Sequence, residues 1–293
     1  MKVYLTLVAM ALSFLTGAQD RTIADSLFNA KEWNEASKAF KKIVEQHSSD
    51  SSAWFKLGVS QMSFENYSDA IASFKRALDT NYPETQGKLA LAKAFILNGD
   101  KKSMYQYLNE SIDSGLAAYA FVKNESAFSD FLSEAEFIAL LEKIKLNAYP
   151  CLSAKNYRHF DFWLGTWDVY ANGRKAGVNI ITMAEGGCAI HESYTTQGNY
   201  SGQSINFYDP IDKKWHQHWV GSSGDVYNYL ETDRGPGLLQ FESKYMGPNG
   251  QISLSRLTFT LNEDGSVRQL FESSTDQGKT WTAAFDGLYK KTQ

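Results

Sequence analysis

The sequence lacks an excess of basic residues, a long apolar stretch beyond its first residues, and the common catalytic motifs. Its 29 Lys and Arg residues are outnumbered by 33 Asp and Glu residues, so the formal net charge is −4 over 293 residues. Nucleic-acid binding needs a basic face and is therefore not expected. No later apolar run reaches the roughly 18 residues that a membrane-spanning helix needs, so no transmembrane segment is expected.

The absent catalytic motifs exclude several classes of enzyme. The chain has no HExxH zinc signature, and Gly186-Gly187 precedes a predicted strand, whereas a phosphate-binding loop leads into a helix. Ser222 and Ser273 lie in turns or at strand ends, without the strand–elbow–helix context of a nucleophilic serine. We therefore predict no catalytic residue and no cofactor.

The first 18 residues have the pattern of a signal peptide. Lys2 supplies a positive start, residues 3–15 are mostly apolar, and Thr16-Gly17-Ala18 offers small residues for cleavage ahead of Gln19. No cysteine stands at the cleavage point, so a lipid anchor is not expected there. The pattern predicts a secreted or periplasmic protein.

Only two cysteines, Cys151 and Cys188, are present, and both would survive cleavage. An oxidising compartment favours a disulfide between them, which would tie the start of the C-terminal half to an early strand. Two buried free thiols are the alternative, because spacing alone cannot bring two Cα atoms within about 7 Å.

The N-terminal half contains a repeat of 34 residues. A shift of that length aligns Trp33 with Tyr67, Ala36 with Ala70, and Phe40 with Phe74. The second copy adds Trp54-x-x-Leu57-Gly58 and closes at Pro83. This pattern resembles the tetratricopeptide repeat, in which small residues let paired helices touch. We predict about three repeats over residues 19–115, followed by a capping helix and linker over residues 116–150.

The resemblance implies a binding groove for a protein segment along the first helix of each repeat. The residues expected to line the groove are Phe55, Val59, Met62, Leu89, Lys93 and Ile96. Two alternatives remain: the repeats form a spacer, or their apolar surface docks on the C-terminal half.

From Phe160 the helical period gives way to short alternating runs separated by turn residues such as Asn172-Gly173 and Asp264-Gly265. Gly165-x-Trp167 suits the opening strand of a closed antiparallel barrel. The predicted fold is therefore a two-domain α-then-β chain. A tetratricopeptide-repeat solenoid precedes a calycin-like β-barrel of about ten strands over residues 151–293.

The C-terminal half resembles a group of uncharacterised calycin-like (lipocalin-like) barrels, the DUF1579-like group. The stretches that carry the resemblance are residues 160–169, 186–188, 207–210, 215–220, 256–259, 274–281 and 285–289. The resemblance implies a fold without an assigned function. Calycin barrels in general carry small, largely apolar ligands, nitrobindin-like relatives hold haem, and a few relatives act on carotenoids.

Two histidines are the most conspicuous candidate ligands in this half. His216 and His218 are two residues apart on one predicted strand, so they share a face. They could bind a metal with His191 or Glu192 as a third ligand. The alternative, which we favour, is a wet face opposite Trp215 and Trp219, so we predict no metal.

Further candidate ligand-binding residues are expected to point into the barrel: Trp167, Tyr208, Arg256 and Arg268. An inward Glu192 paired with Arg256 or Arg268 would form a buried ion pair or a polar anchor. Either arginine could instead stack on Trp167, as is common in lipocalin-like barrels.

These observations favour a secreted or periplasmic binding protein. Its barrel would hold a small apolar or amphipathic ligand, and its repeat groove would contact a protein segment. One alternative is an interaction protein or scaffold with a filled barrel and no ligand. The other is a hydratase- or isomerase-type enzyme, which requires an inward carboxylate or histidine of perturbed pKa beside a cavity.

Overall fold

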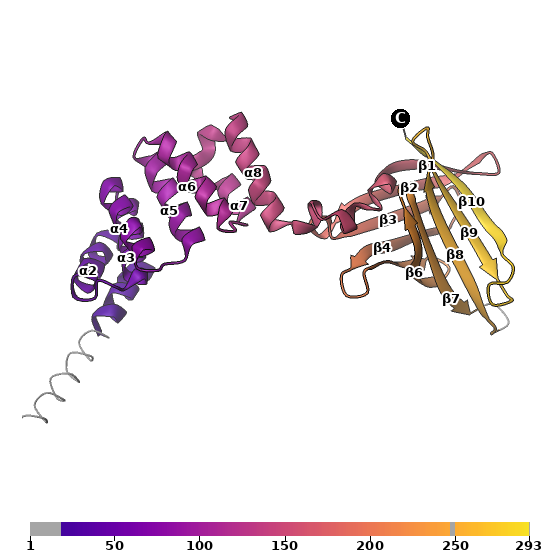
Figure 1. The fold of residues 1–293 in the computed structure, drawn as a ribbon, viewed down its shortest axis with the longest axis horizontal. Helices are drawn as coiled ribbons and strands as arrows, with labels where there is room; N and C mark the ends of the chain where they lie inside the picture. The colour runs from indigo at the N-terminus through magenta and orange to yellow at the C-terminus, as the bar shows by residue number, and fades with distance from the viewer. Residues whose placement is uncertain (1–18, 247–249, 293) are drawn as a thin grey trace, which may run out of the picture. The chain divides into compact units, whose positions relative to one another are not determined.

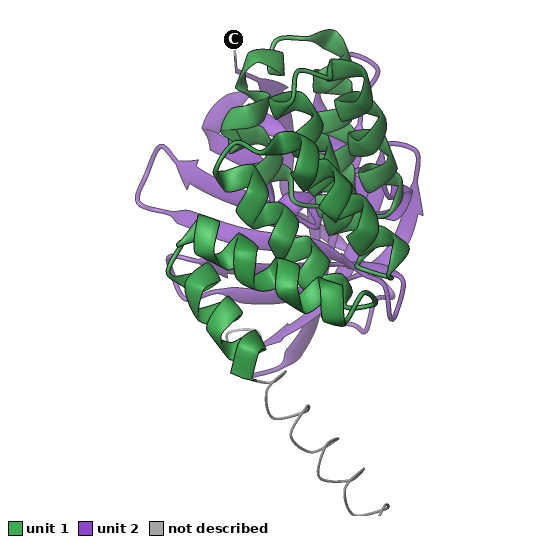
Figure 2. Cartoon of the chain, turned by 90° about the vertical axis from the view of Figure 1, so that its left-hand side faces the viewer, with its two compact units in different colours: residues 1–148 green, residues 149–293 purple. Residues whose placement is uncertain are grey.

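The computed structural model describes residues 19–246 and 250–292. The predicted signal peptide lies outside these residues. The chain divides into two compact units, Met1–Ala148 and Tyr149–Gln293 (Figure 2). No helix in the described ranges is long and apolar enough to cross a membrane.

The first unit consists of helices arranged as consecutive antiparallel pairs (Figure 1). Residues 19–29 form a helix. The later helices are α2 (Trp33–Gln46), α3 (Ser51–Ser63), α4 (Tyr67–Asp79), α5 (Glu84–Leu97), α6 (Lys101–Asp113), α7 (Tyr119–Asn124), the 3-10 helix η1 (Ser126–Phe131) and α8 (Ala135–Ala148). The prediction of tetratricopeptide-like repeats is confirmed.

Small residues let the paired helices approach, as the repeat pattern predicts. A Cβ atom on Gly58 would lie 2.7 Å from Cδ1 of Phe74, so only glycine leaves room for the ring that fills the space between α3 and α4. Two helices begin with the same device: Asp50 accepts a hydrogen bond from Ala53 N at 2.9 Å, and Asp100 accepts one from Ser103 N at 3.0 Å.

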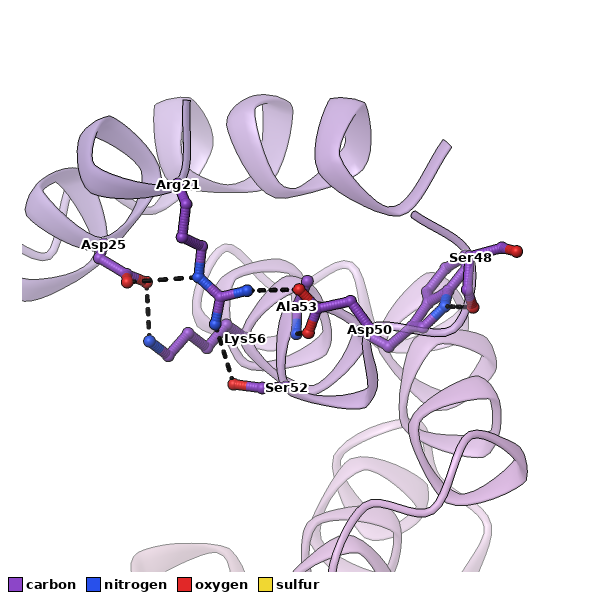
Figure 3. A network of polar contacts seen from close by, with 8 residues as sticks. Arg21, Asp25, Ser48, Asp50, Ser52, Ala53 and Lys56 are labelled. Carbon is purple, nitrogen blue, oxygen red and sulfur yellow. Dashed lines mark hydrogen bonds and ion pairs between the residues drawn. The ribbon is translucent and has the colours of Figure 1, made fainter. Parts of the chain in front are cut away.

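A polar network fixes the helix of residues 19–29 to α3 (Figure 3). Arg21 donates from Nη1 to Asp50 at 2.5 Å and from Nη2 to Ser52 at 3.1 Å. Asp25 accepts from Lys56 at 2.7 Å and from Arg21 Nε at 3.3 Å. Burial raises the pKa of Asp25, but Lys56 and Arg21 outweigh it and lower the pKa below its ordinary value.

Helix α8 covers the hydrophobic core at the C-terminal end of the repeats. Its residues Phe137, Leu140 and Ile144 are buried in one cluster with Met104 and Leu108 of α6. The predicted capping segment therefore contains a helix whose apolar face packs on the last repeat.

The second unit is a closed barrel of ten antiparallel strands, which confirms the predicted fold class. Each strand pairs with the next along the chain, and β1 closes the barrel against β10. The strands are β1 (Gly165–Ala171), β2 (Arg174–Ala184), β3 (Ala189–Thr196), β4 (Ser201–Asp209), β5 (Lys214–Gly221), β6 (Val226–Gly235), β7 (Leu238–Met246), β8 (Ile252–Leu261), β9 (Val267–Ser274) and β10 (Thr282–Lys291).

One end of the barrel is filled by the segment that precedes β1. This segment includes the 3-10 helices η3 (Lys155–Arg158) and η4 (Asp161–Trp163). Phe160 and Trp163 are fully buried and stack with ring centroids 4.7 Å apart. Trp167 donates from Nε1 to Trp163 O at 2.8 Å. The Gly-x-Trp element thus belongs to an aromatic plug, and the open space of the barrel lies towards its other end.

A disulfide holds the plug segment to the turn between β2 and β3. Cys151 and Cys188 are joined with an S–S distance of 2.02 Å and a Cα–Cα distance of 5.0 Å. The flanking glycines allow this approach. A Cβ on Gly186 would lie 2.4 Å from Tyr149 Cδ1, and one on Gly187 would lie 2.6 Å from Leu152 Cδ2.

Candidate functional site

The interior of the barrel contains a cavity of about 420 Å³ at the end opposite the plug. Its walls are mainly aromatic and are formed by Tyr194, Trp219, Tyr227, Phe271 and Phe285. Its polar lining consists of Glu192, Thr196, Tyr200, Gln217, Asp225, Tyr229, Gln269 and Tyr289. A largely apolar pocket with a few converging polar groups is the usual form of a small-molecule site.

Strand alternation brings these side chains to the inside. On β5, Gln217 and Trp219 line the cavity, and Trp215 is buried in the core cluster on the same side. On β3, Glu192 and Tyr194 line it. Because successive side chains point to opposite faces, the residues between them lie on the outer wall.

Glu192 is a buried carboxyl group in the lining of the cavity. It is 2% exposed and accepts hydrogen bonds from Asn179 Nδ2 at 2.7 Å and Ser204 Oγ at 2.6 Å. Burial raises its pKa to about 7, and the bonds from Ser204 and Asn179 oppose that rise. Near neutral pH the carboxyl group is therefore present in both its protonated and its ionised form.

Glu192 is the centre of a hydrogen-bonded chain that we call the polar belt. From β5 to β9 its members are Gln217, Asn206, Ser204, Glu192, Asn179, Tyr289 and Gln269. We call the belt the floor of the cavity: four of its members line the cavity, and the other three are buried. The buried Oδ1 atom of Asn179 has no hydrogen-bond partner among the described residues.

A second carboxylate lies among the lining residues in the turn between β5 and β6. Asp225 accepts hydrogen bonds from Tyr200 Oη at 2.8 Å, Trp219 Nε1 at 3.0 Å and Ser223 Oγ at 2.7 Å. Burial raises the pKa of Asp225, but these hydrogen bonds outweigh it, so the pKa lies below the ordinary value. Asp225 is therefore a stable anion at neutral pH.

The aromatic wall is a connected set of rings. The Tyr227 ring centroid lies 5.6 Å from that of Tyr229, 5.5 Å from that of Tyr245 and 6.0 Å from that of Phe271. These separations are in the favourable range for aromatic pairs. The rings thus pack against one another at the cavity wall.

Among the candidate ligand-binding residues, three have buried side chains inside the barrel: Trp167, Glu192 and Tyr208. Only Glu192 lines the cavity. Trp167 and Tyr208 belong to the core cluster with the plug, where the Tyr208 ring packs against Tyr157 at 5.3 Å. They fill the barrel and do not contact the open space.

The three candidate histidines, whose inward or outward direction the sequence left open, lie on the outer wall. His191 contacts Gln203 Oε1 at 3.2 Å, and His218 contacts Asn228 Oδ1 at 2.6 Å. His216 stacks on Phe207 with centroids 5.2 Å apart. The register that places Trp215, Gln217 and Trp219 inside fixes His216 and His218 outside.

Both candidate arginines also lie outside, so neither pairs with Glu192 or stacks on Trp167. Arg256 pairs with Glu272 at 2.9 Å, and its guanidinium lies 4.1 Å from the Trp281 ring centroid. Arg268 pairs with Asp286 at 2.7 Å. Instead, Nζ of Lys291 lies 5.4 Å from the ring centroid of Trp167.

The proposed metal ligands are not brought together either, because Glu192 is inside and the histidines are outside. A different group, Asp209, Asp212 and His216, has ligand atoms within 4.8 Å of one another. Its oxygens are already engaged: Asp209 accepts from Ile211 N at 2.7 Å, and Asp212 accepts from His216 at 2.8 Å. The hydrogen bonds of a surface turn account for this arrangement.

The predicted groove residues of the repeats are half-buried. Phe55 stacks on Tyr82 with ring centroids 4.1 Å apart, and Val59 and Met62 pack against the core cluster of α4 and α5. Lys93 pairs with Glu125 at 2.8 Å. The remaining predicted members, Leu89 and Ile96, pack against the cluster of α6 and α8. Each of these predicted groove residues thus contacts other residues of the first unit with part of its side chain.

Most of the cavity residues were not predicted from the sequence. Gln217 stands between His216 and His218, and the parity of Trp215 and Trp219 would have indicated it. Asp225 was not predicted as a site residue. Tyr289 and Gln269 gave no signal, because their role comes from the closure of β9 and β10 into the barrel.

Comparisons with known proteins bear on the first unit. The tetratricopeptide-repeat family model matches residues 52–85, so this segment is a tetratricopeptide repeat, a fold that indicates protein–protein interaction. No curated protein shows significant similarity to the chain.

Three solved structures resemble part of the chain at low scores. The type III secretion translocator chaperone SycD of Yersinia enterocolitica (alternative dimer) is 19% identical over 45% of this chain and 92% of its own, with a TM-score of 0.33. SycD of Yersinia enterocolitica in complex with a peptide of the translocator YopD is 19% identical over 45% of this chain and 93% of its own, with a TM-score of 0.34. The TPR2B-domain:pHsp70 complex of yeast Sti1 is 14% identical over 44% of this chain and 96% of its own, with a TM-score of 0.34. We draw no inference about this chain from scores at this level.

Proposed function

We propose that this chain is a secreted or periplasmic binding protein whose barrel holds a small apolar or amphipathic ligand. The observation that carries this proposal is the cavity of about 420 Å³ between aromatic walls and a polar floor. A scaffold with a filled barrel would have no such space. The volume lies within the range of small-molecule pockets.

The repeats would supply the second contact, with a protein segment bound along α3 and α5. The accessible parts of Phe55, Val59, Met62 and Lys93 would line this groove. The apolar side chains of this groove suit the apolar face of an amphipathic segment.

A dye titration tests the barrel. N-phenylnaphthylamine is an uncharged apolar dye whose fluorescence rises in apolar surroundings, and we expect the full chain to bind it saturably. Ala176→Trp should weaken binding, because Ala176 lines the cavity and the indole would take up part of its space. Ile180→Trp is the matched control on the same strand, since Ile180 is 45% exposed. Equal binding by both variants would contradict the proposal.

A peptide library tests the groove. Phage-displayed peptides selected on the full chain should lose affinity by about tenfold or more with Val59→Asp, because a charge would enter the apolar contact. Ala72→Asp, at an exposed position of α4, should leave binding unchanged. Peptides that bind both variants alike would place the contact elsewhere.

The proposed location has its own test. Cell fractionation should find the protein outside the cytoplasm, and sequencing of its N-terminus should begin at Gln19. A cytoplasmic protein that keeps its first 18 residues would contradict the signal peptide.

One observation favours a second candidate function, an enzyme acting on a hydrophobic substrate. Glu192 is an inward carboxyl group beside the cavity with its pKa raised to about 7 by burial, and such a group suits general acid–base catalysis. Turnover of a ligand recovered from the cavity, abolished by Glu192→Gln, would establish it. Release of that ligand unchanged would favour simple binding.

A further inference from the structure

We propose that the barrel cavity selects an organic cation, an ammonium group attached to an apolar body, and rejects carboxylates. This inference rests on the proposed function, because it names the class of ligand that the same cavity would take.

The charged groups of the cavity are all acidic. Glu192 and Asp225 line it, and no Lys, Arg or His belongs to the lining. Within residues 19–246 and 250–292, neither carboxylate forms an ion pair. Arg268, a cation of the barrel wall, pairs instead with Asp286 on the outer wall. Acids without an ion-pair partner in the lining of a cavity produce a negative potential that attracts cations.

Asp225 supplies the permanent part of this charge. All three of its side-chain donors are neutral groups: the hydroxyls of Tyr200 and Ser223 and the indole of Trp219. Neutral donors hold the carboxylate in place and in its ionised form without cancelling its charge. A counter-charge must then come from solvent or from a ligand.

The walls suit the same cation. Trp219 and Tyr227 line the cavity with Tyr194, Phe271 and Phe285, and the ring faces of Trp and Tyr attract an ammonium group within about 6 Å. The indole of Trp219 donates to Asp225 at 3.0 Å, so an aromatic face and an anion lie side by side. An ammonium among these rings would gain from both.

The same cavity would disfavour a ligand that carries a carboxylate. Its carboxylate would lose water on entry and would face Glu192 and Asp225 with no cation in the lining. Repulsion of the wrong charge is a common source of specificity. A neutral head group would avoid the repulsion and could bond to the polar belt, so its affinity should lie between those of the cation and the anion.

Three probes of one shape test this order. Phenylbutylamine, phenylbutanol and phenylbutanoate share an apolar body and differ only in the charge of the head group. By titration calorimetry with the full chain near neutral pH, the amine should bind about tenfold more tightly than the alcohol. The acid should bind more weakly than the alcohol.

Two variants assign the preference to the residues named. Asp225→Asn should weaken the amine about tenfold and leave the alcohol unchanged, because it removes charge and keeps the shape. Glu263→Gln removes an acid from the exposed turn between β8 and β9 and should change neither. Because Asp225 also holds Tyr200 and Trp219, Tyr227→Leu serves as an independent second variant. It should weaken the amine more than the alcohol, since it keeps apolar volume and removes the ring face.

The outcomes separate this inference from the function on which it rests. Binding of the alcohol or the acid as tightly as the amine would overturn the cation preference and leave ligand binding in place. The same holds if N-phenylnaphthylamine binds and none of the three probes does. Failure of all three probes and of the dye would overturn the proposed function itself.

Discussion

The Oγ atom of Ser204 lies 2.6 Å from Oε2 of Glu192, and this bond joins β4 to β3 inside the barrel. On the other side of the carboxyl group, Asn179 Nδ2 of β2 lies 2.7 Å from Oε1. The carboxyl group is thus held at the cavity floor by two neutral side chains. Its protonation state should therefore affect both the stability of the barrel and the chemistry of the cavity.

Stability should depend on the proton of Glu192. Burial raises its folded-state pKa from 4.5 to about 7, so between these values the folded chain holds a proton that the unfolded chain has released. The free energy of unfolding contributed by this group should therefore be fully present below about pH 4.5 and should fall as pH rises to about 7. Urea unfolding of the wild type and of Glu192→Gln over this range measures the effect.

Glu192→Gln removes the titrating group and keeps the size of the side chain. The stability of the wild type relative to this variant should decrease with rising pH and then level off above about pH 7. A difference that does not change with pH would show that Glu192 titrates at its ordinary value.

Reduction of the Cys151–Cys188 bond should destabilise the barrel. The bond closes a loop with a sequence separation of 37 residues, and closure of such loops typically adds about 2–4 kcal/mol to the free energy of unfolding. Urea unfolding with and without a reducing agent, followed by tryptophan fluorescence, measures this change. Cys151→Ser with Cys188→Ser is the control, because reductant should not affect it. A wild-type transition that reductant does not move would argue against the bond.

Arg21 should stabilise the first unit. Its guanidinium bonds to Asp25, Asp50 and Ser52, and Arg21→Ala would remove these three bonds. Because the arginine side chain is 29% exposed, the expected loss is modest, about 1 kcal/mol. Thermal unfolding followed by helical circular dichroism checks it. Lys41→Ala, an exposed position on α2, should have no measurable effect, and equal melting temperatures for the two variants would contradict the role of the network.

The architecture was predictable because its signals are local. The 34-residue repeat and the small residue at Gly58 are readable along the chain, and the packing of Phe74 on Gly58 uses them directly. The alternation and turn residues after Phe160 likewise predicted about ten strands, and the barrel has ten.

The site was less predictable because it depends on register and closure. His216 and Gln217 are adjacent, and a shift of one residue exchanges which of them faces inward. The sequence shows Trp167 but cannot show that β10 returns to place Lys291 opposite it, where the cation was expected from Arg256 or Arg268. The pKa of Glu192 depends on burial and on bonds from β2 and β4, which no spacing rule reveals.

The most direct test of ligand binding is a comparison of native and denaturing mass spectra of the protein isolated from its own cells. The account predicts a native mass above that of the polypeptide, with the excess lost on denaturation and its size identifying the ligand. Partial filling of the cavity by Ala176→Trp should reduce the excess, and Ile180→Trp should retain it. A native mass equal to that of the bare polypeptide, in protein that also fails to bind N-phenylnaphthylamine, would contradict the account and favour a scaffold.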